Sequence, residues 1–350
     1  MTTIDPLRAT CPAPHADTER VLLGHGSGGQ LMTELLDEVV TAGLGEPGPL
    51  EDAALVGLGD VDVVVSTDSF VVTPRFFPGG DIGSLAVYGT VNDLAMRGAR
   101  PVALALAYIL EEGLPTAELH AITASVAAAA GDCGVRVVTG DTKVVQRGAA
   151  DGAYLTTTGI GVRLRDTYPS AASGRRGDRV LLSGPIGVHG TAILSAREGL
   201  GFDTEIHSDS QPLHRLVAAM IDAGGVDVHA LRDPTRGGLA SALNELATAS
   251  RVAVEIDEPT VPVPDEVRSA CELLGLDPLH VANEGCLVAF VAPRSADAVL
   301  EAMRADPAGR QARVIGTLTD GPAGRVTART LVGSHRIVDM LVGEQLPRIC

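Results

Sequence analysis

Aromatic residues are scarce in this chain of 350 residues: Trp is absent, and Phe, Trp and Tyr together make up 3% of it. Hydrophobic residues nevertheless make up 45%, so the interior must be built from Ala, Val, Leu and Ile with many glycines. Such a composition is typical of α/β layers in which helices pack through small residues. Because 350 residues exceed what one hydrophobic core normally supports, we expect two domains.

Apolar targeting and membrane-spanning segments are also lacking. Residues 1–20 contain no apolar signal core, and no uninterrupted apolar run elsewhere is long enough to cross a bilayer. Secretion and membrane insertion are therefore not expected. The cysteines include no short pair of the kind that binds zinc or forms a redox motif, and their number is odd. They are Cys11, Cys133, Cys271, Cys286 and Cys350. We therefore predict a reduced, cytoplasmic protein.

Positive charge is the third deficit. The formal net charge is -17 at pH 7, and no basic patch stands out along the chain. A nucleic-acid partner is therefore not expected, because the surface would repel a polyanion. A phosphate ligand would need magnesium as an intermediary.

A glycine-rich stretch at residues 23–30 precedes a predicted helix at Leu31–Val40. Glycines before a helix let backbone N–H groups approach a phosphate, and the helix dipole adds to the attraction. A flexible hinge explains the same residues equally well. The stretch therefore leaves a phosphate site and a hinge as alternatives.

Acidic residues follow predicted strands or lie within a buried helix. The strand-like run Val61–Thr67 predicts that Asp68 lies at a strand end, where ligands of α/β sheets gather. Asp81 is a predicted cap for a helix that runs to Arg97. On that helix Asp93 falls within an apolar stripe, where a carboxylate needs a partner or a metal.

A second acid follows the predicted strand Val135–Thr139, in a predicted turn with the sequence Gly140-Asp141-Thr142-Lys143. Together Asp68, Asp93 and Asp141 predict a Mg²⁺ site that leaves coordination positions for water and nucleotide phosphates. Asn92 would add a further oxygen ligand beside it. Lys143 would reach a phosphate or carry a proton if desolvation lowered its pKa, although a lone lysine is more often solvated surface.

The second half begins after a Gly- and Arg-rich crossing at Ser173–Gly177. Two glycine-rich turns, at Gly184–Gly190 and Asp233–Gly238, each precede a predicted helix. Each would hold an anion or allow close backbone packing. Glu284 stands just ahead of a predicted apolar strand at Leu287–Val291.

The chain ends on a cysteine, Cys350. Terminal segments are mobile unless they are tied down, so this sulfur would move into and out of a cleft. A chemical handle and an incidental surface cysteine are both consistent with the residue alone. A thiol beside a terminal carboxylate should be less acidic than usual, which argues against spontaneous reactivity.

Taken together, these motifs resemble the hydrogenase maturation factor HypE family, within the aminoimidazole ribonucleotide synthetase (PurM-like) superfamily. The resemblance runs from about Val21 to the end of the chain. The terminal Pro-Arg-Ile-Cys separates HypE from relatives such as selenophosphate synthetase and thiamine monophosphate kinase. The quoted motifs are His25–Gly29, Ser66–Phe70, Phe77–Gly83, Gly89–Ala95, Gly140–Lys143, Asn283–Gly285 and Pro347–Cys350.

The resemblance implies a two-domain α/β PurM-like fold. It comprises a flexible leader at 1–20, an N-terminal ATP-binding and dimerisation domain at 21–165, a C-terminal domain at 175–340 and a mobile tail at 341–350. The implied activity is the ATP- and Mg²⁺-dependent dehydration of an S-carbamoyl group on the terminal cysteine to a thiocyanate. That product supplies cyanide ligands to the [NiFe]-hydrogenase iron. The implied partners are a HypF-type carbamoyltransferase, the HypC–HypD complex as cyanide acceptor, and a second copy in a homodimer.

The resemblance also implies roles for single residues. Cys350 is the carrier thiol, and Lys143 and Glu284 lie near the thiocarboxamide. Elimination of water requires a general base, for which Glu284 is the candidate, with Lys143 orienting the group or stabilising charge; the two roles are interchangeable at this stage. His25 and His189 would either contact nucleotide or form local hydrogen bonds. The implied nucleotide-binding residues are Gly26, Ser27, Gly28, Gly29, Asp68, Asn92, Asp93 and Asp141, and the implied metal ligands are Asp68, Asp93 and Asp141.

Two other functions remain open from the sequence. A kinase or synthetase of the same superfamily would phosphorylate a free small molecule and would not need residues 343–350. A non-catalytic thiol carrier would dock partners through its tail and would not bind ATP.

Overall fold

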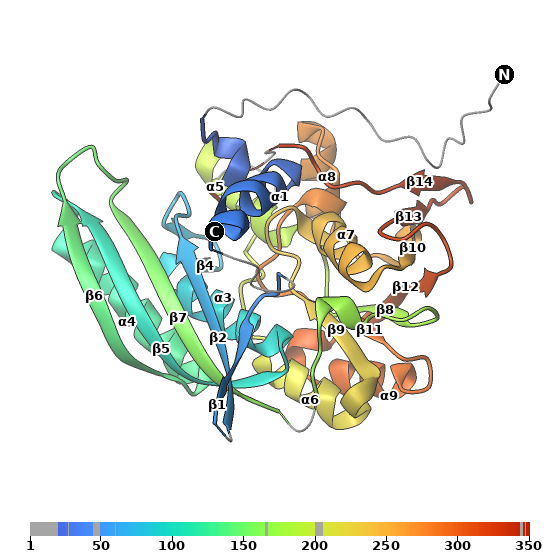
Figure 1. The fold of residues 1–350 in the computed structure, drawn as a ribbon. Helices are drawn as coiled ribbons and strands as arrows, with labels where there is room; N and C mark the ends of the chain where they lie inside the picture. Colours follow the sequence, from blue (N-terminus) through green and yellow to red (C-terminus); the bar gives the residue numbers. More distant parts are fainter. Residues whose placement is uncertain are drawn as a thin grey trace.

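The computed structural model describes residues 20–26, 28–44, 50–59, 61–164, 167–199, 206–343, 346 and 348–350. These residues form two large sheets with helices packed against them, and one two-stranded ribbon (Figure 1). Among them, no helix is both long and apolar enough to cross a membrane. The expected mixed α/β architecture is confirmed.

The first sheet has five strands in the order β1-β2-β7-β5-β6. Strands β5 and β6 are parallel, and the other neighbouring pairs are antiparallel. Helices α3 and α4 pack against each other, and α3 also contacts β2, β5 and β7. A two-stranded ribbon of β3 and β4 leads into α3. The elements of this half are β1 (Ala54–Leu58), β2 (Val61–Phe70), β3 (Phe76–Phe77), β4 (Gly80–Asp81), α3 (Ile82–Met96), β5 (Ala99–Glu111), α4 (Thr116–Cys133), β6 (Arg136–Val145) and β7 (Ala153–Arg163).

Helix α3 begins and ends where the sequence predicts. The Asp81 side chain accepts hydrogen bonds from the backbone N–H groups of Gly83 and Ser84, and Ser84 reaches back to the Asp81 backbone. This reciprocal cap satisfies backbone donors that the first turn leaves unpaired. At the other end Gly98 adopts a φ of 67°, a left-handed conformation that glycine takes without a steric penalty.

Two predicted strand ends are wrong. Strand β2 continues past Asp68 to Phe70. Strand β6 extends from Arg136 to Val145 and therefore includes the predicted turn at Gly140–Lys143. Gly140 marks a close approach between strands, because a Cβ there would collide with the carbonyl oxygen of Leu106 on β5. Glycine inside a strand is used at such approaches as well as at turns, so the residue type alone did not separate the two.

The second sheet has seven strands in the order β14-β13-β10-β12-β8-β11-β9. All its neighbouring pairs are antiparallel except β10 with β13. Helices α6 and α9 contact each other, as do α5 and α8. The elements of this half are β8 (Arg179–Leu182), α5 (Val188–Glu198), α6 (His214–Gly224), β9 (Val228–Arg232), α7 (Gly238–Ser250), β10 (Ala253–Asp257), α8 (Asp265–Leu274), β11 (Val288–Val291), α9 (Ala296–Ala305), β12 (Arg313–Thr319), β13 (Val326–Arg329) and β14 (His335–Ile337).

The two halves share buried contacts. Ala95 and Met96, at the end of α3, belong to a core cluster formed mainly by the second half. Ile349, next to the C-terminus, belongs to the core of the first half. The C-terminus therefore lies within the body of the molecule (Figure 1).

The first helical segment of the chain packs near the other end of the sequence. It consists of α1 (Gln30–Leu35), a π-helical turn (Leu36–Thr41) and α2 (Ala42–Leu44). The backbone N–H groups of Gln30 and Leu31 donate to the carbonyls of Leu341 and Val342, over 2.9 and 3.2 Å. The start of α1 is thereby joined to the first residues of the C-terminal tail.

Candidate active site

A cavity of about 880 Å³ is lined by residues of both halves. Its volume lies in the range typical of small-molecule sites. The first half contributes Gly28, Asp52, Asp68 and Asp93, the second contributes Asp233, Arg236 and Glu284, and the tail contributes Cys350. The cavity therefore gathers residues that are far apart in the sequence.

Three buried or half-buried carboxylates form one group in this cavity. Asp52 precedes β1, Asp93 lies on α3 and Asp233 follows β9, and one oxygen of each lies within 4.8 Å of the others. Such a set of hard oxygen donors fits Mg²⁺, which is commonly bound by a few carboxylates together with water and phosphate. Ser66 donates a hydrogen bond to Asp93 over 2.6 Å and fixes that carboxylate.

The electrostatics of the group favour the binding of a cation. Burial raises the pKa of Asp52 to about 6, and Arg232 offsets part of that rise. Burial followed by the charge of Asp52 raises the pKa of Asp233 to about 8. Burial followed by Asp233 and Asp68 raises the pKa of Asp93 well above its usual range. Carboxylates held this close disfavour one another's ionisation, and a bound cation would relieve that repulsion.

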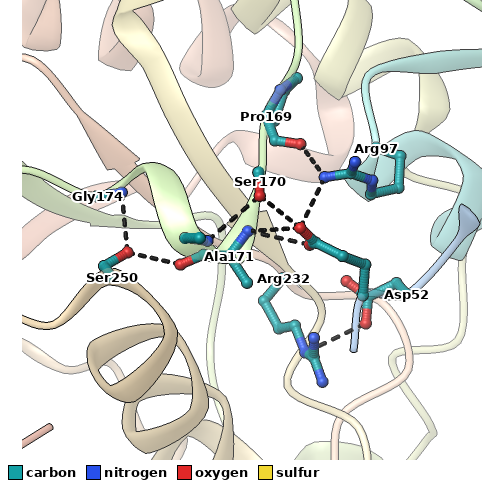
Figure 2. Close-up of polar contacts among 10 residues, drawn as sticks. Asp52, Arg97, Pro169, Ser170, Ala171, Gly174, Arg232 and Ser250 are labelled. Atoms are coloured by element: carbon teal, nitrogen blue, oxygen red, sulfur yellow. Dashed lines mark hydrogen bonds and ion pairs between the residues drawn. The ribbon is translucent and has the colours of Figure 1, made fainter. Parts of the chain in front are cut away.

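Arg232, at the end of β9, neutralises only part of this negative charge. It forms an ion pair with Asp52 over 3.1 Å and a second ion pair with Glu245. Figure 2 shows the Arg232 guanidinium directed at Asp52 from the opposite half of the molecule. The charges of Asp233 and Asp93 also raise the pKa of Arg232, so one guanidinium serves four carboxyl groups.

The residue before Asp52 is anchored to the segment that joins the halves. Glu51 accepts hydrogen bonds from the Ser170 hydroxyl, over 2.5 Å, and from the Ala171 backbone N–H, and it forms an ion pair with Arg97 over 3.1 Å. Figure 2 shows Arg97 bonded to the Pro169 carbonyl, at the same joint. The joint between the halves therefore fixes the backbone that presents Asp52.

The expected metal ligands are only partly brought together. Asp93 belongs to the carboxylate group, and Asp68 lines the same cavity. Asp141 lies on strand β6, where its side chain is 60% exposed and pairs with Lys143 over 2.6 Å. Within the part of the chain that the structure describes, Asp141 and Lys143 do not line the cavity.

Asp52 and Asp233 were not identified from the sequence. Asp233 is the first residue of the turn Asp233–Gly238, whose glycines indicated an anion site or close backbone packing and not a metal ligand. Asp52 follows Glu51 ahead of a short strand and has no motif of its own. Their proximity depends on how the two halves meet, which residue patterns do not specify.

Glu284 is buried, with 4% of its surface exposed, and lines the cavity. Its Oε1 atom has no hydrogen-bond partner among the described residues. Burial raises the pKa of this carboxyl group well above its usual range, and Asp233 and Asp68 raise it further. An unpartnered buried carboxyl is a candidate for proton transfer with a bound group.

The backbone around Glu284 is held rigidly. Asp209 accepts hydrogen bonds from the Glu284 and Gly285 backbone N–H groups over 3.1 and 3.2 Å. Asn283 accepts one from the Gly187 backbone N–H over 2.6 Å. A Cβ at Gly285 would collide with the Asp209 carbonyl oxygen, so glycine is required there. This loop presents Glu284 to the cavity in a fixed position.

The glycine-rich stretch contributes one lining residue. Gly28 lines the cavity with a φ of 75°, and a Cβ there would lie 2.8 Å from Arg236. Gly29 is the N-cap of α1, and Gly26 accepts a hydrogen bond from Arg236 over 3.4 Å. Neither of these two lines the cavity, and Ser27 lies outside the described residues.

Two other expected residues have structural partners. Asn92 is buried and joins α3 to the second half, donating to the Gln211 carbonyl over 3.1 Å and accepting from the Leu213 N–H over 2.8 Å. Among the described residues it does not line the cavity. His25 bonds locally, accepting from the Leu22 backbone N–H over 2.9 Å.

The terminal cysteine reaches the cavity. Cys350 is half-buried, and its backbone carbonyl accepts a hydrogen bond from the Val71 N–H over 2.9 Å. Burial raises the pKa of its thiol far above the usual range, and the nearby Arg236 guanidinium offsets part of that rise. The sulfur is therefore a poor nucleophile in this position, and it lies in one cavity with the carboxylate group and Glu284.

Comparisons with known proteins place this site in context. Residues 50–163 match the model of the AIR synthase related protein N-terminal domain, and residues 175–329 match that of the C-terminal domain. The carbamoyl dehydratase HypE of Azotobacter vinelandii is 54% identical over 328 residues, which cover 93% of this chain and 96% of that protein.

Two solved structures have a similar fold and related sequences. A HypE in complex with ATP is 46% identical, with a TM-score of 0.80, and covers 95% of this chain and 100% of its own. A HypE in complex with HypF is also 46% identical, with a TM-score of 0.84, and covers 88% of this chain and 99% of its own.

Proposed function

Because the chain belongs to the AIR synthase related proteins and, within them, to the HypE family, we propose that it is an ATP-dependent carbamoyl dehydratase of hydrogenase maturation. Its substrate is an S-carbamoyl group on its own Cys350, which it converts to a thiocyanate. The observation that carries this proposal is the position of Cys350 in one cavity with Glu284 and the buried carboxylate group. The sequence identity of 54% to a named carbamoyl dehydratase supports it.

The reaction has two stages. The carbamoyl oxygen attacks the γ-phosphorus of ATP, and ADP leaves. The nitrogen then loses a proton, the C–O bond breaks and phosphate departs with the oxygen; loss of the second nitrogen proton leaves S–C≡N. Phosphorylation is needed because hydroxide is a poor leaving group, whereas phosphate is a good one. Alignment and charge stabilisation account for most of the catalysis in such phosphoryl transfers.

Magnesium would be held by Asp52, Asp93 and Asp233, with Asp68 nearby. This set revises the expected ligands Asp68, Asp93 and Asp141. When bound, the ion would neutralise phosphate charge that the carboxylates alone would repel. A related HypE has been solved with ATP, which supports ATP as the nucleotide.

Arg236 lines the same cavity as Cys350. Its guanidinium would stabilise charge on the phosphorylated oxygen as the C–O bond breaks. Gly28 packs against Arg236 and restricts its position.

Glu284 would act as the general base. A carboxyl group with a raised pKa is a strong base once it is ionised, and its unpartnered Oε1 atom leaves a free acceptor for a nitrogen proton. Positive charge nearby would favour its ionised form.

A second copy of the chain would supply Lys143. Side chains alternate along β6, so Asp141 and Lys143 share a face with their register partners on β5, Ala107 and Ile109. That sheet face also carries exposed apolar side chains, which are Val56, Leu58, Val61, Ile109 and Ile160. An apolar face of this kind indicates a protein interface. In a homodimer through this face, Lys143 of each chain would approach the cavity of the other.

Other partners act on the tail in succession. A HypF-type carbamoyltransferase would load Cys350 in the reduced cytoplasm, and a solved complex of a related HypE with HypF supports that partner. The HypC–HypD complex would then accept cyanide for the [NiFe]-hydrogenase iron. Both exchanges require the tail to leave the cavity.

Intact-mass analysis of protein carbamoylated on Cys350 tests the proposal. Addition of ATP and Mg²⁺ should remove the mass of one water, and Glu284→Gln should slow this loss by a factor of about 10²–10⁴, the usual contribution of a general base. Glu272→Gln, on the exposed side of α8, is the matched control and should react normally. Persistence of the carbamoyl mass while ATP is hydrolysed would contradict dehydration. Full ATP-dependent activity on a free substrate after deletion of residues 343–350 would favour a kinase or synthetase.

A further inference from the structure

His189, at the start of α5, is fully buried and lies outside the cavity lining. Its Nε2 atom lies 2.6 Å from the Ile349 carbonyl oxygen, and its Nδ1 atom lies 2.7 Å from the Ser208 hydroxyl. A carbonyl can only accept a hydrogen bond, so Nε2 carries the proton and Nδ1 accepts from Ser208. Burial lowers the pKa of His189 to about 4, so the ring is neutral at pH 7.

The hydrogen bonds around this ring run in one direction. The Ser210 backbone N–H donates to the Ser208 hydroxyl over 3.1 Å, which leaves the hydroxyl proton directed at His189. The Ser208 backbone N–H is itself bonded to the Pro78 carbonyl over 2.8 Å. Ser208 is therefore fixed, and it fixes both the orientation and the tautomer of His189.

Arg197, two turns further along α5, binds the same part of the tail. It donates to the Arg348 carbonyl over 2.8 Å and to the Thr73 carbonyl over 2.9 Å. The Thr73 backbone N–H also donates to the Arg348 carbonyl, over 3.2 Å. Arg197 thus clamps the tail to the segment that follows β2.

Each of the last three backbone carbonyls therefore has a donor. Thr73 and Arg197 bind that of Arg348, His189 binds that of Ile349, and Val71 binds that of Cys350. The Ile349 side chain is also buried, in the core of the first half. The docked tail is bound along its whole final stretch.

We propose that His189 and Arg197 form a latch that holds the docked tail by its backbone, and that they are positioning residues for the Cys350 sulfur. This proposal rests on the proposed function, in which Cys350 carries the reacting group. Both side chains bind backbone carbonyls and neither binds the sulfur. The latch therefore holds the tail in the same way whether the sulfur is free, carbamoylated or converted to thiocyanate.

The alkylation rate of Cys350 measures the latch directly. Protein without nucleotide is treated with iodoacetamide at constant pH, and the peptide 345–350 released by cleavage after glutamate is followed by mass. His189→Leu removes the donor, and we expect labelling about tenfold faster, in line with the loss of one buried hydrogen bond. His189→Gln retains an N–H donor at a similar reach and should label within about threefold of the native protein.

Two further variants keep the proposal testable. Arg197→Gln should also speed labelling, and it addresses the latch independently if His189→Leu does not fold. His120→Leu, on the exposed face of α4, is the matched control and should label at the native rate. Unchanged labelling in His189→Leu, or equal labelling in the Leu and Gln variants, would overturn the latch.

A second readout separates positioning from general stability. In carbamoylated protein, His189→Leu should lower the single-turnover rate of water loss while the dissociation constant for ATP stays unchanged. The labelling test needs neither ATP nor a carbamoyl group. Native labelling in His189→Leu with normal dehydration would refute the latch alone, whereas altered labelling without dehydration in the native protein would refute the proposed function alone.

Discussion

At the scale of single residues, the site combines negative charges that the isolated chain cannot fully compensate. Asp52 has Arg232 as its ion-pair partner, whereas Asp93 and Asp233 face each other's charge in a buried setting. Such an arrangement destabilises the metal-free protein and favours a cation or a cationic ligand. The strain of this group and its proposed function as a metal site thus have one cause.

The pKa of Asp233, raised to about 8, predicts a pH-dependent stability. A carboxyl whose pKa is higher in the folded state binds more protons there than when unfolded. Its contribution is therefore complete at low pH and is lost as the pH rises from about 4 to about 8. We expect Asp233→Asn to flatten this dependence and to raise the Tm of metal-free protein by a few degrees at pH 8.

Thermal melts with and without Mg²⁺ at pH 5 and pH 8 provide the measurement. Native protein should gain stability from Mg²⁺ at pH 8, and the variant should gain much less. Asp297→Asn, in the exposed first turn of α9, is the matched control and should behave as native. An equal gain from Mg²⁺ in both proteins would exclude Asp233 as a ligand.

At the scale of elements, the uninterrupted course of strand β6 changes the expected positions of Asp141 and Lys143. The sequence predicted a turn at Gly140–Lys143, whereas the strand continues and carries Asp141 and Lys143 on an open sheet face. Residues on such a face act on a ligand only if another surface covers them. Lys143 would therefore act on a ligand only in an assembly in which a second chain covers this face of β6.

We expect Ile160→Glu to convert a dimer into a monomer. Ile160 lies on β7, is 45% exposed and shares the apolar sheet face with Ile109. A glutamate there would have to be buried without a partner at the interface, which costs several kcal/mol. Light scattering at micromolar concentration is the measurement. Leu331→Glu, in the exposed loop after β13, is the control and should stay dimeric.

Mixed dimers test whether Lys143 acts across that interface. A Lys143→Ala chain joined to a Cys350→Ala chain has one cavity with both an intact tail and a lysine from the other chain. We expect this mixture to regain up to half of the native dehydration, although each variant alone is inactive. Failure to regain activity in confirmed mixed dimers would place Lys143 outside the partner's site.

At the scale of the whole molecule, the tail closes the cavity that the two halves form. Its last residues belong to the core of the first half, and its carbonyls are bound by both halves. Cys350 is therefore placed by the complete tertiary structure. In the proposed function, loading and delivery would require this stretch to be released as a unit.

Three residues added after Cys350 should abolish dehydration. The Cys350 carbonyl is already bonded to Val71, and the sulfur borders the cavity, so an extension would have to occupy space that the nucleotide needs. We expect at least a 100-fold loss in the rate of water removal. Carbamoylation of the undocked tail should be nearly normal. The same three residues added before Met1 are the control, and dehydration at the native rate in the C-terminal extension would contradict docking as the active arrangement.

The sequence by itself determined the family, the two α/β halves and most element positions. Capping at Asp81, a glycine stop at Gly98 and β-branched runs are local signals, and local physics fixes local structure. The terminal cysteine and Glu284 were recognised because they belong to sequence motifs. The sequence predicted a weakly acidic thiol from the adjacent carboxylate, whereas in the structure burial raises the pKa of this thiol.

Only the tertiary structure decided which residues share the cavity. Asp52 and Asp233 lie beside Asp93 because the two halves meet there. Asp141 and Lys143 lie on an outer sheet face because β6 continues through Gly140. His189 contacts Ile349 in the tail, which lies 160 positions further along the chain. These contacts depend on packing between distant segments, and the separation of two residues along a chain carries little information about their distance in the fold.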